Sequence, residues 1–156
     1  MLLRKIKLFV YDFDGVMTNN KVLVDQNGHE SVIVSRADGL GVSEIKKLGF
    51  DQIIISTEKN PVVSVRAKKL KIKCLQGINR KKSALLEYCK KNRTDLNQVA
   101  FVGNDLNDME VMEIAGYTLC PSDAHESIKK ISDYILETKG GEGVIRELFE
   151  LITTNK

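Results

Sequence analysis

Two aspartates, Asp12 and Asp14, follow directly after an apolar run over residues 6–11. Because they are two positions apart, both side chains project from the same side of an extended chain, about 7 Å apart along it. Carboxylates this close repel each other unless a cation or a shared proton compensates, so the pair predicts a divalent metal ion. Ligands that are all oxygen favour Mg²⁺. Taken alone, the same DxDG pattern is also compatible with an exposed Asp-Gly turn.

Two further polar segments follow apolar runs in the same way. Ser56 to Glu58 come after residues 53–55, and the segment GNDLND, residues 103–108, comes after residues 99–102. The second segment offers several oxygen ligands. Its alternative role is the N-terminus of a helix, where acids are favoured by the helix dipole, and this role is compatible with metal binding.

The elements that must position these segments alternate between strand and helix. Apolar runs predict strands at residues 6–11, 53–55, 74–75, 99–102, 117–119 and 134–136. Helical spacing and stop signals predict helices at residues 40–48, 61–70, 81–91, 105–115, 124–131 and 144–152. A turn at residues 25–28 between residues 22–24 and 32–34 predicts a β-hairpin.

This alternation predicts an α/β fold: one Rossmann-like parallel sheet with helices on both faces and a β-hairpin inserted after the first strand. In such sheets, ligands bind beyond the carboxyl ends of the strands. Asp12 to Gly15, Ser56 to Glu58 and Gly103 to Asp108 all sit at predicted strand ends. The sequence therefore predicts one site built from these three segments.

Composition excludes several other classes. The 156 residues suffice for a single domain, 1–156, and their 42% hydrophobic and 29% charged content is typical of a globular protein. No apolar run approaches the length of a membrane span, and charged residues interrupt the N-terminal segment, so we expect a cytoplasmic protein without a membrane partner. The net charge of +3 is spread over several predicted helices, which argues against nucleic acid. The three cysteines form no metal-binding or disulfide pattern.

In their order, these motifs resemble the haloacid dehalogenase superfamily of phosphotransferases. The resemblance runs over nearly the whole chain: YDFDGVMT from Tyr11, a strand that ends at Ser56, a lysine near Lys81, and then GNDLND. It implies that Asp12 is the nucleophile, which forms an aspartyl phosphate that water then hydrolyses. Asp14 would act as acid and then as base, which requires a raised carboxyl pKa.

The resemblance also implies how the phosphoryl group and the metal are held. Ser56 would donate to phosphoryl oxygens, and Lys81 would neutralise their charge, with Lys82 as the alternative lysine. Mg²⁺ would be bound by the Asp12 carboxylate, the Asp14 backbone carbonyl and Asn104. Asn104 stands where the commoner family pattern has an aspartate, so the amide oxygen would bind with one less negative charge. Asp105 and Asp108 would compensate, directly or through water.

Spacing leaves no room for a cap domain, because predicted hairpin and helix residues fill the intervals from Asp14 to Ser56 and from Ser56 to Lys81. Among capless members, the closest resemblance is to the tetrameric phosphatases of sugar-acid metabolism, through RADGLG from Arg36, the hairpin before it, and GGEGVIRE from Gly140. It implies a homotetramer in which a neighbouring subunit helps to close the site.

The substrate is expected to be a small sugar-acid phosphate. Octulosonate 8-phosphate (KDO 8-phosphate) phosphatases usually carry Gly-Arg where this chain has Thr57 and Glu58, and a glutamate there resembles the nonulosonate 9-phosphate phosphatases. Helical spacing from Glu58 through Val62 and Arg66 to Lys69 predicts that Glu58 and Lys69 share a face that contacts the substrate. The main prediction is thus a nine-carbon sugar-acid 9-phosphate such as that of N-acetylneuraminate or KDN, with KDO 8-phosphate as the alternative.

Two other classes compete with this interpretation. A signalling receiver domain also surrounds a phosphorylated aspartate with acids, a hydroxyl and a lysine, but its acceptor should end the third strand, where residues 74–75 have no aspartate following them. A non-catalytic assembly module, similar to domains attached to some sialic acid cytidylyltransferases, would tolerate weak metal binding at Asn104.

Overall fold

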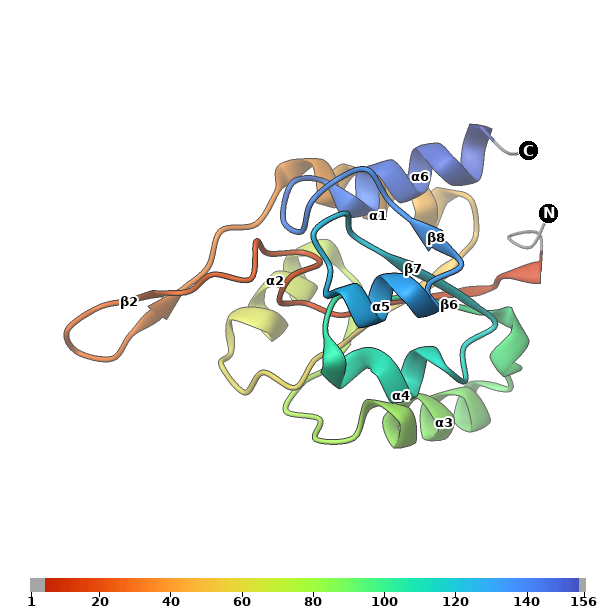
Figure 1. Ribbon diagram of the computed structural model, residues 1–156, viewed down its shortest axis with the longest axis horizontal. Helices are drawn as coiled ribbons and strands as arrows, with labels where there is room; N and C mark the ends of the chain where they lie inside the picture. Colours follow the sequence, from red (N-terminus) through yellow and green to blue (C-terminus); the bar gives the residue numbers. More distant parts are fainter. Residues whose placement is uncertain (1–4, 155–156) are drawn as a thin grey trace.

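A six-stranded parallel sheet forms the centre of the molecule in the computed structural model, which describes residues 5–154 (Figure 1). The strand order is β5-β4-β1-β6-β7-β8. The strands are β1 (Leu8–Tyr11), β4 (Asp51–Ile55), β5 (Lys73–Leu75), β6 (Val99–Val102), β7 (Tyr117–Cys120) and β8 (Tyr134–Ile135). The central strands β1 and β6 are buried on both faces, which explains their continuous apolar sequences. Residues 1–4 and 155–156 of the predicted domain lie outside the described range.

Helices cover both faces of the sheet and form a core on each (Figure 1). One core packs helices α1 (Arg36–Lys47), α2 (Val62–Leu70) and α6 (Val144–Thr154) against the sheet. The other packs α3 (Lys81–Asn92), α4 (Met109–Met112) and α5 (Glu126–Ile131) against the opposite face. Two 3₁₀ turns, η2 (Leu96–Gln98) and η3 (Leu106–Asp108), precede β6 and α4. The predicted fold class is confirmed, with the hairpin in place after β1 and no cap domain among the described residues.

The hairpin projects away from the sheet as an arm (Figure 1). Its strands are β2 (Leu23–Val24) and β3 (Glu30–Ser31), so the prediction of a second strand at residues 32–34 was wrong. The cause is Asp25, whose carboxylate accepts hydrogen bonds from the backbone N–H groups of Asn27 and His29. These bonds widen the loop, and Val24 pairs with Glu30. Residues 32–34 instead lead back to the core, where Val34 bridges to Thr18.

Several predicted helices have different bounds in the structure, since α1 begins at Arg36 rather than at residue 40 and α5 begins at Glu126 rather than at residue 124. The helix expected at residues 105–115 is reduced to η3 and α4, because Asp105 and Asp108 cap each other's backbone and make a tight 3₁₀ turn first. Helix α2 agrees with the helix predicted at residues 61–70 to within one residue, and Glu58 lies in the preceding loop. Between residues 5 and 154, no helix is long and apolar enough to cross a membrane, and the cytoplasmic location stays a prediction.

Candidate active site

Three neighbouring strands bring the predicted segments together. Strands β4, β1 and β6 are adjacent and parallel, so the loops after Ile55, Tyr11 and Val102 leave the sheet at the same edge. The first residue of each loop is also fixed by the neighbouring strand or loop: the backbone N–H of Asp12 donates to Val102 O at 2.9 Å, and that of Ser56 donates to Leu75 O at 2.9 Å. The sheet thus sets the relative positions of the candidate residues.

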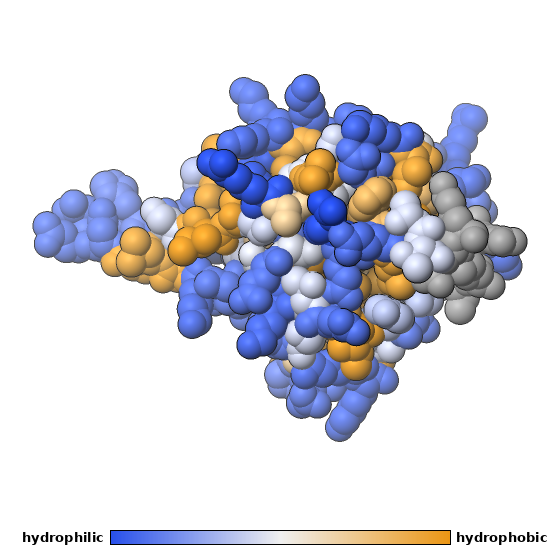
Figure 2. Space-filling view, turned by 90° about the horizontal axis from the view of Figure 1, so that it is seen from above, coloured by the Kyte–Doolittle hydropathy of each residue, from blue (hydrophilic) through white to orange (hydrophobic). Residues whose placement is uncertain are grey.

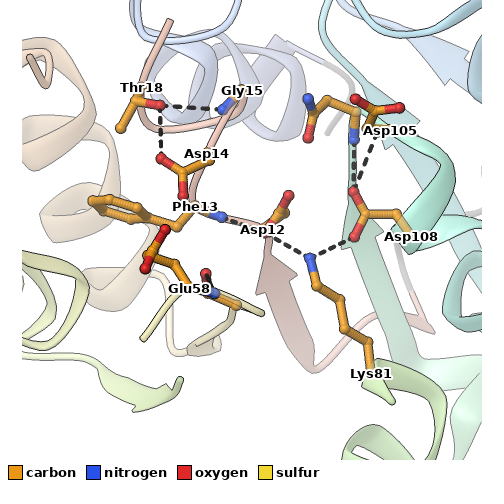
Figure 3. Close-up of polar contacts among 11 residues, drawn as sticks. Asp12, Phe13, Asp14, Gly15, Thr18, Glu58, Lys81, Asp105 and Asp108 are labelled. Atoms are coloured by element: carbon orange, nitrogen blue, oxygen red, sulfur yellow. Dashed lines mark hydrogen bonds and ion pairs between the residues drawn. The ribbon is translucent and has the colours of Figure 1, made fainter. Parts of the chain in front are cut away.

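Lys81 lies between two buried carboxylates (Figure 3). Its Nζ is 2.6 Å from Asp12 Oδ1 and 2.7 Å from Asp108 Oδ1, and the side chains of all three residues are at most 5% exposed. Lys82, the alternative lysine in the sequence, is only partly buried. The structure therefore places Lys81, at the first position of α3, beside the candidate nucleophile.

Electrostatics within this cluster follow from burial and charge. Burial and the neighbouring Asp108 charge raise the pKa of Asp12 to about 7, although Lys81 and the Phe13 N–H oppose the shift. Burial alone would lower the pKa of Lys81, but Asp12 and Asp108 together raise it above its usual value. Lys81 is therefore a permanent cation, and the charge of Asp12 depends on the cations near it.

Three polar atoms converge beside Asp12 in a way that fits Mg²⁺. One terminal atom of the Asn104 amide lies 2.9 Å from the Asp14 carbonyl oxygen and 3.0 Å from Asp12 Oδ2. With nitrogen in that position, the amide donates to both oxygens. With its oxygen there, the amide oxygen lies about 3 Å from each of the other two. Adjacent oxygen ligands of octahedral Mg²⁺, each about 2.1 Å from the metal, are separated by about 3.0 Å. The residues therefore fit the predicted metal, because one carboxylate, one backbone carbonyl and one amide can each supply an oxygen ligand.

Asn104 is held firmly in this position. Its backbone N–H donates to Asp108 Oδ2 at 2.9 Å, and its carbonyl accepts from the His125 N–H at 2.8 Å. Gly15 lies against its side chain, so closely that a Cβ there would be 2.0 Å from Asn104 Nδ2. Asp108 thus serves both Lys81 and Asn104, whereas the Asp105 carboxylate caps η3 by accepting from the Leu106 N–H at 2.7 Å.

Asp14 stands apart from this cluster and is half-buried. Its Oδ1 accepts a hydrogen bond of 3.3 Å from Thr18 Oγ1, which also accepts from the Gly15 N–H at 3.2 Å (Figure 3). Burial raises the pKa of Asp14, Thr18 opposes this, and the charges of Glu58 and Glu30 add to the rise. The raised pKa expected of an acid that protonates a leaving group is therefore present.

Ser56 begins the loop that closes the other side of the site. It is 1% exposed, and its Oγ accepts a hydrogen bond of 3.1 Å from the Glu58 N–H. The hydroxyl proton remains free to donate to a phosphoryl oxygen. Glu58 is fixed in turn, because its Oε1 accepts from the backbone N–H groups of Lys59 and Asn60, both at 2.7 Å. Thr57, which lies between Ser56 and Glu58, is exposed.

A cleft of about 240 Å³ opens beside Asp14. Glu58 and Asn60 line one wall, and the base of the hairpin lines the other. The hairpin residues in the lining are Asn20, Lys21, Val22, Glu30 and Val32. Sequence reasoning missed them, because nothing in the local pattern shows that the hairpin folds toward the loop after β4. A larger hollow of about 400 Å³ lies at the opposite edge of the sheet, around Asp51 and Lys73, away from the catalytic residues.

The predicted shared face of Glu58 and Lys69 is not present. Glu58 precedes α2, whereas Lys69 is exposed in its last turn and is absent from the lining of the cleft. Arg66, on the same predicted face, donates to Ser35 O at 2.8 Å instead. The reason is that Glu58 lies before the helix predicted at residues 61–70. It stands in a loop, where its carboxylate accepts from the N–H groups of Lys59 and Asn60, so the helical register does not extend to it.

Comparison with known proteins identifies the family. Residues 43–148 match the family model of haloacid dehalogenase-like hydrolases. The chain belongs to this family. The predicted superfamily is thereby confirmed, and the hydrolase is a phosphoric monoester hydrolase. A signalling receiver domain is no longer an alternative.

The relatives of this hydrolase share nearly its whole length. It is 32% identical over 148 residues, 94% of this chain and 79% of the relative, to 3-deoxy-D-manno-octulosonate 8-phosphate phosphatase of Escherichia coli strain K12. The same-named phosphatase of Moraxella catarrhalis, solved with magnesium ion, phosphate ion and KDO, has a TM-score of 0.94 and 33% identity over 99% of this chain and 90% of that one. A protein of Streptomyces avermitilis named as a HAD family hydrolase has a TM-score of 0.91 and 40% identity over 94% of this chain and 84% of that one.

Proposed function

We propose that this hydrolase cleaves the phosphate monoester of a sugar acid with Mg²⁺ as its cofactor. The observation that carries the proposal is that one terminal atom of the Asn104 amide lies 2.9 Å from the Asp14 carbonyl oxygen and 3.0 Å from Asp12 Oδ2. Lys81 adds a fixed cation on the other oxygen of Asp12. Together these groups can accommodate the charge of a phosphoryl group beside a nucleophile.

Catalysis by the chain's own residues takes two steps. Asp12 attacks phosphorus in line, the bond to the sugar oxygen breaks, and Asp14 donates its proton to that oxygen. Asp14 then accepts a proton from water, which attacks the aspartyl phosphate and regenerates Asp12. Lys81 and the Ser56 hydroxyl bind phosphoryl oxygens in both steps. The bound Mg²⁺ would supply positive charge that stabilises the phosphoryl group.

Among sugar acids, the relatives favour KDO 8-phosphate, because two of them carry that substrate in their names. This is the alternative that the sequence left open, and it is better supported than the main prediction of a nonulosonate 9-phosphate. One observation favours the nonulosonate as second candidate. Glu58 replaces the arginine usual in octulosonate enzymes, and it lines the cleft next to Asp14. Its carboxylate suits hydroxyl or amide donors on a longer sugar chain.

We further propose that the active form is a homotetramer in which a neighbouring subunit covers the open cleft. Support comes from the arm, where the exposed fractions of Val22, Leu23, Val24 and Ile33 are 50%, 73%, 56% and 75%. Figure 2 shows hydrophobic surface along the projecting arm. Apolar side chains gathered on a projecting hairpin are typical of a contact surface. A monomeric mass in light scattering at micromolar concentration would contradict this proposal.

Phosphate release from a matched panel tests the function. The panel contains KDO 8-phosphate, N-acetylneuraminate 9-phosphate, KDN 9-phosphate and a hexose phosphate, each with Mg²⁺ and with the Asp12→Asn variant as control. We expect turnover that Asp12→Asn abolishes. Equal and negligible rates for both proteins would instead support the non-catalytic assembly module.

The same panel separates the two substrates. A preference for KDO 8-phosphate supports the first candidate, and a preference for the nine-carbon acids supports the second. The variant Glu58→Gln keeps the acceptor for the N–H groups of Lys59 and Asn60 and removes only the charge. If Glu58 selects the sugar, this variant changes kcat/KM for the preferred sugar acid more than for the hexose phosphate.

A further inference from the structure

Two oxygens of the proposed metal site come from different loops. Asp14 supplies its carbonyl from the loop after β1, and Asn104 supplies its amide from the loop after β6. Their separation must be held constant if Mg²⁺, with its strict octahedral geometry, is to bind both. Two further segments join these loops: residues 121–125 after β7, and the glycine-rich stretch that begins at Gly140.

Residues 121–125 hold Asn104 directly. The backbone N–H of His125 donates to the Asn104 carbonyl at 2.8 Å. The same loop also binds residues 137–143, which we call the glycine strap. Asp123 Oδ1 accepts from the N–H of the buried Gly140 at 2.9 Å, and the Ser122 N–H donates to Thr138 O at 3.1 Å.

From there the glycine strap reaches the loop after β1. The Gly141 N–H donates to Val16 O at 3.0 Å. The two backbones are in direct contact, since a Cβ at Gly140 would lie 2.2 Å from Gly15 O and a Cβ at Gly141 would lie 2.5 Å from Asn19 N. Only glycine allows this approach. The strap is therefore in direct contact with Gly15, the residue that follows Asp14.

Both ends of the strap are anchored. Glu147 of α6 accepts from the N–H groups of Glu137 and Thr138 at 2.9 and 2.8 Å, and Asp38 of α1 accepts from the Ile145 N–H at 2.7 Å. The strap is thus held in place on both sides of its glycines. Near the metal site, its position depends on the hydrogen bond from the Gly140 N–H to Asp123.

We propose that Asp123 is a positioning residue for the metal site. It acts through Gly140 on the Asp14 carbonyl, while His125 of the same loop acts on Asn104, so that one short loop sets the distance between the two ligands. This inference rests on the proposed metal site. Loss of the Asp123 carboxylate leaves the buried Gly140 N–H without its acceptor and allows the strap to move away from Gly15.

The test compares Asp123→Ala with Asp123→Asn, which retains the Oδ1 acceptor. The matched control is Asp133→Ala, which removes another exposed aspartate that anchors backbone, through Thr118 N–H at 2.8 Å, but at the opposite edge of the sheet. Mg²⁺ binding is measured by calorimetry without substrate, and hydrogen exchange is followed in the peptide that covers residues 12–20.

We expect Asp123→Ala to weaken Mg²⁺ binding by about tenfold and to speed exchange in residues 12–20, in the way that groups behind metal ligands affect affinity. Asp123→Asn and Asp133→Ala should bind Mg²⁺ as the unaltered chain does. Unchanged binding and exchange in Asp123→Ala, or equal losses in Asp133→Ala, would overturn the inference. Because calorimetry needs no turnover, this result is independent of whether any sugar phosphate is hydrolysed, and a failure of the proposed function appears separately in the phosphate-release panel.

Discussion

Lys81 and Asp108 form a buried ion pair of 2.7 Å, and the other oxygen of Asp108 accepts the N–H of Asn104 at 2.9 Å. One carboxylate thus joins the start of α3 to the loop after β6. Because Lys81 Nζ is also 2.6 Å from Asp12, the same pair connects the candidate nucleophile to a candidate metal ligand. The charge balance of the whole site depends on one ammonium group.

The first prediction concerns that ammonium. Lys81→Met leaves Asp12 and Asp108 as uncompensated buried carboxylates, so we expect phosphate release to fall by about a hundredfold or more and the free energy of unfolding to fall by about 3 kcal/mol. Lys82→Met, at the partly buried neighbour, is the control and should change either quantity little. Similar losses in both variants would show that α3 as a whole, rather than the Lys81 ammonium, matters.

A second prediction uses two glycines with the same backbone conformation. Gly15 and Gly49 have φ of +87° and +89°, so alanine at either costs about 1 kcal/mol of stability from strain. Only at Gly15 would the new Cβ collide with Asn104, while at Gly49 no atom lies within 4 Å. We therefore expect Gly15→Ala to lose Mg²⁺ affinity in calorimetry and Gly49→Ala to retain it. Equal affinities would mean that Asn104 is not a ligand.

Asn104→Asp tests the departure from the family pattern. An added carboxylate beside Asp12 and the Asp14 carbonyl places an acceptor against two acceptors, so the metal-free protein should lose stability, whereas Mg²⁺ should bind about tenfold more tightly. Melting temperatures with and without Mg²⁺ measure both effects. Asn107→Asp adds the same charge at an exposed position of the same segment and serves as control. A smaller response to Mg²⁺ in Asn104→Asp than in the control would contradict the assignment.

The fourth prediction is a dependence of stability on pH. Burial raises the pKa of Asp38 to about 6, against the bonds from Ile145 and Arg146 and the charge of Arg66. The pKa of an aspartate in the unfolded chain is about 3.9, so the folded state binds the Asp38 proton more tightly than the unfolded state does. The free energy of unfolding therefore falls as pH rises from about 4 to about 6.

Asp38→Asn removes this titration and keeps an acceptor for the Ile145 N–H. In urea unfolding at pH 4.5 and 7.5, we expect the variant to gain about 2 kcal/mol relative to the unaltered chain at the higher pH. The same difference in free energy of unfolding between the variant and the unaltered chain at both pH values would show that Asp38 does not titrate in this range.

Local sequence was sufficient for the strands and for the residues at their ends. Asp12, Ser56 and Asn104 follow buried apolar runs, and parallel order then brings them together. Local sequence could not separate Lys81 from Lys82, because both stand at the start of α3 and only burial against Asp12 and Asp108 distinguishes them.

Contacts between distant segments lay beyond sequence patterns. The hairpin wall of the cleft depends on where the arm turns, which Asp25 alters by widening its loop. The contact of Gly140 with Gly15 joins residues at opposite ends of the chain, and a GG pair alone is equally typical of a flexible linker. The face expected to carry Glu58 and Lys69 is absent for a local reason, because Glu58 lies in the loop before α2 and hydrogen-bonds to the backbone of that loop.

The arm contributes residues to the cleft but none of its strand residues to the cores. Strands β2 and β3 are exposed throughout and belong to neither core, yet Val22 before β2 and Glu30 within β3 line the cleft. Because Val22 and Glu30 are exposed, substitutions there should change the folding stability of the single chain little. If the cleft binds the sugar, substitutions at these two positions can therefore change which alcohol is preferred, while the buried residues that carry out phosphoryl transfer stay unchanged.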